Sequence, residues 1–405
     1  MKIPYEQCVT CKGTKRACGL ASCPILDKLN NQLPRQLNAK EVVFGPTPPN
    51  AFVGSYGYPN VYYGPMVSIS EDKKANDSPV EWYGKASYND IINFTSSMLR
   101  SKKVSGIFAP RDKSSDPLLE KTQETVLSTK NIDVEVEFKN KPKFQLKFSP
   151  VTAPLGPDGM LKNFKVCDNP VIPKRVDEIL EENLLATQAI DELYSHGHDV
   201  YYLTKIMSTG ILGKQKNKKL VPTRWSITAT DDIVSKQLLP KIRESPEISD
   251  FEVYTAEFLH NHFEILLMPG KWEFEQFEAW APGTLWAFGA PNFQVTEDHE
   301  PFTGKKDYSN QAGGYYASRL AVSEHLNRRG KQARALVFRE IYEGYIVPVG
   351  VWEVRENARH ALASTPKKFS TLPAVLEYLQ TRLRVPLSKY TKKSEILRQS
   401  RLSDF

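Results

Sequence analysis

Four of the five cysteines lie close together near the N-terminus, in the pattern C-x2-C-x6-C-x4-C. They are Cys8, Cys11, Cys18 and Cys23, whereas Cys167 stands alone far along the chain. Two thiolates separated by two residues can bind one ion from a tight turn, and a second pair completes the tetrahedral sulfur site of a structural zinc. In a cytosolic chain such clustering favours metal over disulfides. The spacing therefore predicts one structural zinc held by these four thiolates.

Two alternatives to zinc remain open at this cluster. Pro24 follows the last cysteine, as in some ferredoxin sequences, so an iron–sulfur cluster is the main rival. Four free thiols are the other alternative. Lys12, Lys15 and Arg16 lie between the cysteines, where positive charge should favour thiolates over thiols. Because a four-sulfur site has no open coordination position, we expect the metal to have no catalytic role.

The last seven residues, 399–405, contain a second pattern. Gln399, Leu402 and Phe405 are spaced three apart, and residues with this spacing share one face of a 3-10 turn. A flexible segment with such a face can fold onto a hydrophobic pocket, with Phe405 as its main anchor. The spacing resembles the PIP box (Gln-x-x-aliphatic-x-x-aromatic-aromatic), the peptide that binds the sliding clamp PCNA, although the second aromatic is missing. We therefore expect PCNA as a partner.

A cation, an aromatic ring and two carboxylates follow one another closely between residues 224 and 232. Arg224 precedes Trp225, and Asp231 and Asp232 come shortly afterwards, at the end of a strand expected at 225–228. Such groups can hold an anionic substrate and move a proton when they face one cleft. The alternative is a buried Arg–Asp pair. With Arg319, described next, they form our candidate catalytic pocket of Arg224, Asp231, Asp232 and Arg319, whose chemistry the sequence leaves unknown.

Two glycines precede the helix that carries Arg319. Backbone N–H groups and the helix dipole attract anions at such a helix start, so Gly313, Gly314 and Arg319 are candidate phosphate-binding residues. A tight turn is the alternative. No G-x-x-x-x-G-K-[ST] motif is present, which argues against an ordinary P-loop ATPase.

Basic and aromatic residues interleave in several segments. The aromatic residues of 52–63 are able to stack on unpaired bases, and clustered cations neutralise phosphates. DNA is therefore a second expected partner. The candidate DNA-binding residues are Lys216, Lys218, Lys219, Arg328 and Arg329.

The composition is that of an ordinary globular protein. Of 405 residues, 40% are hydrophobic and 25% are charged, which excludes a disordered chain and allows two or three domains. The formal net charge of +7 permits nucleic acid as a partner without requiring it. The sequence contains no apolar run of about 18 residues and begins without a hydrophobic leader. We therefore expect a cytoplasmic protein that does not enter a membrane.

Periodicity and capping signals predict the elements that must position these residues. The Gly-, Pro- and aromatic-rich stretch 44–66 reads as loop with short strands, and alternation at 131–149 predicts two strands joined through 140–142. Helices are expected at 173–194 and 315–326, and a last one should start at Thr371 as cap with Pro373 in its first turn. Further strands are expected at 225–228, 251–258, 262–267, 335–341 and 345–354.

Strands and helices mix without regular alternation, so the expected fold class is α+β or an irregular α/β arrangement. We expect a zinc module at 1–30, a Gly/Pro/aromatic-rich first lobe at 31–165 and a second α/β lobe at 166–387. The polar and basic segment 388–405 should be a flexible tail that carries the clamp peptide.

Taken together, the two ends and four internal segments resemble the archaeal NreA family of proteins associated with DNA repair. The segments are FVGSYGYPNV at 52–61, TRWSIT at 223–228, GGYYASRLA at 313–321 and GVWEVREN at 350–357. The resemblance spans nearly the whole chain. It implies a repair-associated protein with an N-terminal cysteine module and a clamp peptide, and it supplies no reaction.

The favoured hypothesis is a DNA repair factor that the sliding clamp recruits to DNA. A nucleotide- or NAD-using transferase of the ADP-ribosyltransferase kind, with Arg224 and 313–319 on the phosphates, is the second hypothesis. A non-enzymatic adaptor is the third, so the sequence leaves open whether the protein is an enzyme.

Overall fold

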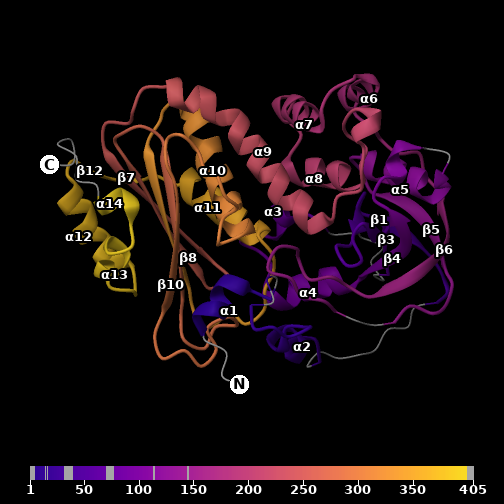
Figure 1. Ribbon diagram of the computed structural model, residues 1–405, viewed down its shortest axis with the longest axis horizontal. Coiled ribbons are helices and arrows are strands. Elements are labelled where there is room, and N and C mark those ends of the chain that lie inside the picture. The colour runs from indigo at the N-terminus through magenta and orange to yellow at the C-terminus, as the bar shows by residue number, and fades with distance from the viewer. Residues whose placement is uncertain are drawn as a thin grey trace.

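The computed structural model describes residues 5–13, 15, 17–31, 40–69, 77–112, 115–143 and 146–398. Two six-stranded sheets lie at opposite sides of this part of the chain, with a layer of helices between and around them (Figure 1). No helix in these ranges has the length and apolar character needed to cross a membrane.

The first sheet has the strand order β1-β5-β6-β4-β3-β2 and is antiparallel except for the β4–β6 pair. One residue in two of β5 is buried, so this face packs on a core that includes Val67, Leu99 and Phe164. The helix α5 (Pro117–Leu127) covers the sheet beside β3 and β6. The strands are β1 (Val42–Thr47), β2 (Ala51–Val53), β3 (Asn60–Ser68), β4 (Met98–Gly106), β5 (Ile132–Phe138) and β6 (Asp158–Val166).

A helical layer separates the sheets, and α9 runs diagonally across the middle of the molecule (Figure 1). The core of this helical layer includes Ile190, Leu203, Ile206 and Val234, which are all fully buried. The layer consists of α6 (Lys174–Glu181), α7 (Ala186–Ser195), α8 (Val200–Ser208) and α9 (Thr223–Glu244). Two short helices, α3 (Pro79–Trp82) and α4 (Tyr88–Ser96), and the 3-10 turns η1 (Ala109–Arg111) and η3 (Gln215–Asn217) complete the first half.

The second sheet has the order β10-β9-β11-β8-β7-β12 and is antiparallel except for the β9–β11 pair. Successive residues of β8 face opposite cores: Ile265 and Leu267 pack under α9, α10 and α11, whereas Leu266 packs on the outer face. Burial on both faces explains the nearly continuous apolar runs of β8 and β11. The strands are β7 (Phe251–Phe258), β8 (Asn261–Met268), β9 (Glu273–Trp280), β10 (Gln294–Glu300), β11 (Arg334–Ile341) and β12 (Lys367–Phe369).

Helices cover both faces of this second sheet (Figure 1). The inner helices are α10 (Gly313–Arg329) and α11 (Trp352–Ala363), and the outer ones are α12 (Leu372–Arg382), α13 (Leu387–Thr391) and α14 (Glu395–Arg398). At the N-terminal end, α1 (Tyr5–Cys11) and α2 (Pro24–Asn31) pack near Trp280 and Trp286 of the same half.

The α+β expectation is confirmed, and so are the elements with long or capped patterns. Strands occur at 251–258, 261–268 and 334–341, and α10 contains the helix expected at 315–326. The Thr371 hydroxyl caps α12 by accepting from the Ala374 N–H, and Pro373 lies in its first turn as expected. The division of the chain into four segments stays a prediction.

Four element predictions are wrong. Residues 225–228 begin α9, where Ser226, Thr230 and Val234 are buried at a four-residue spacing. The expected strand at 345–354 ends in helix α11, which Trp352 begins. Both apolar runs are too short for periodicity to separate strand from helix. The helix expected at 173–194 is two helices, because 182–185 are not helical.

The second strand expected within 131–149 is also not formed as predicted. In the part described, only the single bridges Lys143–Asp158 and Lys147–Leu155 are present, and β5 pairs with β1 and β6 instead.

The C-terminal segment is more ordered than expected between residues 388 and 398. Tyr390 and Ile396 are fully buried against the outer face of the second sheet, and Glu275 accepts hydrogen bonds from the Ser394 hydroxyl and the Glu395 N–H. Polar composition suggested a tail, but two buried apolar side chains and one carboxylate anchor are enough to hold short helices. Residues 399–405, which carry the expected clamp peptide, lie outside the described residues.

Candidate functional site

The four clustered cysteines line one small cavity of about 60 Å³ beside Trp286. None of them forms a disulfide. Burial, followed by the nearness of Cys23, Cys11 and Cys18, raises the pKa of the Cys8 thiol. In the described ranges no three Cys, His, Asp or Glu side chains are already arranged as metal ligands. The donor types nevertheless fit structural zinc, because four sulfurs and no carboxylate or imidazole surround the cavity.

The lysines between these cysteines reach away from them. Lys12 is buried, and its Nζ donates to Glu278 at 2.5 Å and lies 5.3 Å from the ring centroid of Trp280. Lys15 contacts the carbonyl oxygen of Asn310 at 3.5 Å. The expectation that their charge favours a thiolate is therefore wrong for Cys8. These contacts instead dock the cysteine segment onto the second sheet, and Arg16 lies outside the described residues.

The residues of the expected catalytic pocket do not converge on one cleft. Asp231 and Asp232 are neighbours on α9 and face different partners. Asp231 is fully buried and pairs with Arg355 at 2.6 Å. Asp232 lies 3.3 Å from Arg319, whose Nε is 2.8 Å from Glu300. Every one of these charges has a partner within the fold.

Arg224 lies in the first turn of α9, two turns before Asp231. Burial lowers the pKa of its guanidinium, and Tyr308 opposes this shift. The structure therefore brings Arg319 and Asp232 together and leaves Arg224 apart.

Gly313 and Gly314 are buried in the first turn of α10. A Cβ atom at residue 314 would lie 2.9 Å from Oε1 of Glu278, and one at 313 would lie 2.9 Å from Val351. Glu278 also accepts from Arg339 at 2.9 Å. The chain's own carboxylate thus occupies the place beside this helix start that the sequence suggested for a phosphate, and close packing explains both glycines.

The candidate DNA-binding residues fall into two groups. Lys216 and Lys219 are exposed, and Lys218 is half-buried, at the η3 turn. Arg328 and Arg329 end α10, where Arg329 pairs with the buried Glu252. The first group lies beside exposed aromatic rings, and the second does not share that surface.

We call this surface the aromatic–basic patch. Tyr58 and Trp225 pack against each other with ring centroids 5.2 Å apart and ring planes tilted by 58°, although the two side chains are 46% and 44% exposed. The Arg111 guanidinium covers the exposed Phe108 ring at 3.9 Å, and its Nε donates to the Lys218 carbonyl at 3.2 Å. The patch comprises Tyr56, Tyr58, Phe108, Arg111, Lys216, Lys218, Lys219 and Trp225.

Backbone hydrogen bonds hold the segments of the patch together. The N–H of Ile107 donates to the carbonyl of Pro59 at 3.0 Å, and the N–H of Leu220 donates to the carbonyl of Ile107 at 2.7 Å. The loop before β3, the turn after β4 and the segment before α9 are therefore neighbours. Four cations and four rings, distant in sequence, lie on adjoining segments.

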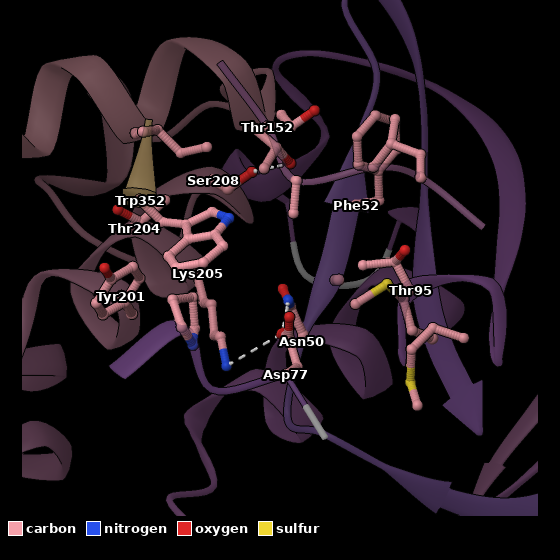
Figure 2. Close-up of a pocket in the computed structure, with 18 of the residues that line it drawn as sticks. Asn50, Phe52, Asp77, Thr95, Thr152, Tyr201, Thr204, Lys205, Ser208 and Trp352 are labelled. Carbon is pink, nitrogen blue, oxygen red and sulfur yellow. Dashed lines mark hydrogen bonds and ion pairs between the residues drawn. The ribbon is translucent and has the colours of Figure 1, made fainter. Parts of the chain in front are cut away.

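A central cavity of about 140 Å³ lies between the first sheet and helices α8, α9 and α11. Figure 2 shows Trp352, Tyr201, Thr204 and Lys205 on one side and Phe52 and Thr95 on the other. Asp77 lies at one end, where it accepts a hydrogen bond from Asn50 and forms an ion pair with Lys205 at 3.7 Å. Further lining residues include Met66, Met98, Arg100, Thr152, Leu155, Ser208, Thr223 and Ile227.

Sequence reasoning missed this cavity and part of the patch. The cavity has no motif, because its walls come from segments as distant as Asn50 and Arg355. The signal for the patch was present in the aromatic residues at 52–63 and the lysines at 214–219, but not in Phe108 and Arg111.

Comparison with known proteins places the chain in a family. Residues 17–287 match the family model described as "Archaeal Nre, N-terminal", and residues 300–405 match "Archaeal Nre, C-terminal". No solved structure matches the chain.

Three curated relatives cover most of the chain. A DNA repair protein NreA of Archaeoglobus fulgidus is 38% identical, over 91% of this chain and 92% of the relative. A DNA repair protein NreB of the same organism is 34% identical over 97% of both chains. A DNA repair protein NreA of Haloferax volcanii is 35% identical, over 87% of this chain and 86% of the relative. With two family models that together cover nearly all residues and these full-length relatives, the chain is a member of the archaeal Nre family.

Proposed function

We propose that this protein is a DNA repair factor that contacts unpaired DNA bases through the aromatic–basic patch. Relatives that cover most of the chain are named DNA repair proteins. The single observation that carries the proposal is the exposed Tyr58–Trp225 ring pair, with Arg111 and the lysines of the patch on adjoining segments.

The physical argument starts from what these rings would do in water. Large aromatic side chains bury much apolar area when they can, so four exposed rings on adjoining segments indicate a surface that a partner covers. Every base has a π face, so stacked aromatics bind single strands without regard to sequence. Arg111, Lys216, Lys218 and Lys219 would supply the positive charge that follows the phosphates.

The transferase hypothesis finds less support. Two of the residues expected on the phosphates are buried against carboxylates: Gly314 packs against Glu278, and Arg319 pairs with Glu300. A phosphate there would have to displace an ion pair that is already made, and Arg224 lies apart from this helix start.

We also propose that a structural zinc binds Cys8, Cys11, Cys18 and Cys23. When bound, the ion would hold α1 and α2 together by neutralising four thiolates. Elemental analysis of protein purified without oxygen should find one zinc per chain. Iron in its place, or no metal at all, contradicts this assignment.

We further propose that PCNA binds the peptide Gln399–Phe405. This segment follows α14 directly, and α14 is fixed to Glu275 of the second sheet. A bound clamp would therefore be held close to that sheet rather than on a long tether. Calorimetry of a 395–405 peptide against the clamp tests this: Phe405→Ala should cost about 2–4 kcal/mol of binding free energy. Equal affinities of the wild-type and Phe405→Ala peptides would contradict the clamp proposal.

The DNA proposal is tested by fluorescence anisotropy with a single-stranded oligonucleotide, its duplex and a duplex with an unpaired loop. We expect the single strand and the loop to bind more tightly than the duplex, and the affinity to fall steeply with salt. Tighter binding of the intact duplex, or binding indifferent to salt, contradicts contact through stacked bases.

A further inference from the structure

The central cavity is a feature of the fold that the proposed function leaves unused. Its walls combine Phe52 and Met66 of the first sheet with Ile227 of α9 and Trp352 of α11. Space inside a fold costs stability, because the atoms that line it lose packing partners. A cavity that nonetheless exists across an interface of sheet and helices is a default binding-site candidate.

Its size selects a small ligand. A cavity of roughly 150 Å³ holds one benzene-sized ring, and this one measures about 140 Å³. One six-membered ring therefore fits inside, and a fused or drug-sized molecule does not fit without leaving part of itself outside.

Its polar groups select a ring with hydrogen-bonding edges. The Asn50 amide and the Asp77 carboxylate meet at one end, together with Lys205 (Figure 2). Thr152 is 5% exposed and lines the same cavity, and its Oγ1 has no hydrogen-bond partner in the described structure. A buried hydroxyl without a partner is costly, so a ligand that bonds it recovers that cost. A hydrocarbon ring would leave the Thr152 hydroxyl without a partner, whereas Asn50, Asp77 and Lys205 are already paired with one another.

The approach to the cavity disfavours negative charge. Asp77, Tyr201 and Lys205 also line an outer groove of about 570 Å³. Glu81 and Asp199 are in this groove as well, so three carboxylates face one lysine. Its histidine, His198, adds little positive charge, because burial lowers the pKa of the imidazole. A phosphate in this groove would meet repulsion.

We propose that the central cavity binds a neutral single-ring nitrogen heterocycle, of the pyrimidine base or nucleoside class. The ring lies between Phe52 and Trp352, one edge meets Asn50 and Asp77 and the opposite edge faces Thr152 (Figure 2), and an attached sugar extends into the outer groove. The same chemistry has two sources: a free base or nucleoside, and a base turned out of a DNA strand. The acidic groove favours the free one. The site is separate from the patch and does not rest on the proposed repair role.

The test uses the full chain and two kinds of probe. Uracil, thymidine and thymidine monophosphate are titrated by calorimetry, and an oligonucleotide with one unpaired thymidine is compared with its abasic equivalent. We expect thymidine to bind more tightly than its monophosphate. Thr204→Met places a larger side chain on the cavity wall, so it should raise the melting temperature without ligand and weaken thymidine binding at least tenfold.

A second variant keeps the test decisive if Thr204→Met does not fold. Thr152→Val keeps the shape and removes the hydroxyl, so it should weaken thymidine about five- to tenfold, the effect of one buried hydrogen bond. The exposed Thr303→Val is the matched control and should change nothing.

The outcomes separate the two sources from failure. Binding of free thymidine supports a free ligand. Preference for the unpaired thymidine over the abasic strand, lost in Thr204→Met, supports a base from DNA. If no probe binds, or if both cavity variants bind every probe as the wild type does, the inference is overturned. The proposed repair role stands or falls separately, on the patch.

Discussion

Two helix starts that the sequence offered as candidate sites have opposite environments. The first turn of α9 contains Arg224 and Trp225, and that of α10 contains Gly313 and Gly314 and leads to Arg319. At α10 Arg319 pairs with the buried Glu300, and Gly314 packs closely against Glu278. At α9 the indole of Trp225 is 44% exposed and packs at a tilt against another exposed ring.

The difference shows how side chains that stabilise the fold can be distinguished from side chains that form a binding surface. Charges at α10 are buried, and buried ions are tolerated only when they are paired and hydrogen-bonded. A ligand there would break existing pairs. Contact with a partner would remove only water from the exposed rings beside α9. Burial of this apolar surface is favourable. Exposure together with a lack of internal partners, rather than residue type, marks the candidate interface.

The largest expected effect is a loss of stability caused by a substitution in α10. Arg319→Met would leave Glu300 buried without its cation, since both side chains are about 1% exposed. Loss of one partner of a buried pair costs about 3–5 kcal/mol of unfolding free energy. Urea denaturation measures this loss. If the residue instead serves only to bind a phosphate, stability should stay near that of the wild type.

The next effect concerns the α9 side. Trp225→Ala removes one stacking platform, worth about 1–3 kcal/mol per base. Affinity for a single strand should fall between about fivefold and 150-fold, with stability changed by about 0.5 kcal/mol. Anisotropy and thermal melting measure the two. Phe288→Ala is the matched control, because this ring is 69% exposed and lies away from the patch, against Lys28. Equal losses in the two variants would contradict a local platform.

A smaller effect is expected from the lysines of the patch. The double variant Lys216→Gln, Lys219→Gln should lower the slope of log affinity against log salt by about 1.4, since each single-strand phosphate contact contributes about 0.7. Binding titrations between low and moderate salt measure the slope. The same change at Lys367 and Lys368 of β12 is the control. An unchanged slope would remove these two lysines from the interface.

The smallest expected effect concerns Glu297, a carboxylate on β10 of the second sheet. Burial and the neighbouring Glu275 carboxylate raise the pKa of Glu297 to about 7. The folded state then holds a proton that the unfolded state releases near pH 4.5. Stability must therefore fall as pH rises through this window.

Glu297→Gln has no proton to lose at this position, so its melting temperature relative to the wild type should rise between pH 5 and pH 8. Melting curves at the two pH values measure the difference. A difference that does not change with pH contradicts the shared proton. Because Glu275 also anchors α14, the variant reports on the helix that precedes the expected clamp peptide.

Much of the fold was predictable wherever the local signal was complete. The alternation of Ile132, Val134 and Val136 fixed β5, because each of these side chains packs on the same face. Thr371 and Pro373 fixed the start of α12 through a hydroxyl cap and a preset φ angle. The strand predictions for 225–228 and 345–354 were wrong, because short apolar runs satisfy strand and helix periods equally.

The sequence by itself determined the chemical types present: four thiols at metal-binding spacing, aromatic rings among lysines, and a polar anchor with two apolar ones at the end. Only the tertiary structure decided which of the candidate side chains are paired or packed within the fold and which stay exposed. Arg319 and Asp232 became an internal ion pair and Gly314 made room for Glu278, whereas Trp225 stayed exposed beside Tyr58. It also built the central cavity, from segments as far apart as Asn50 and Trp352. The physical reason is that pairing and burial depend on neighbours distant in sequence, which no local spacing specifies.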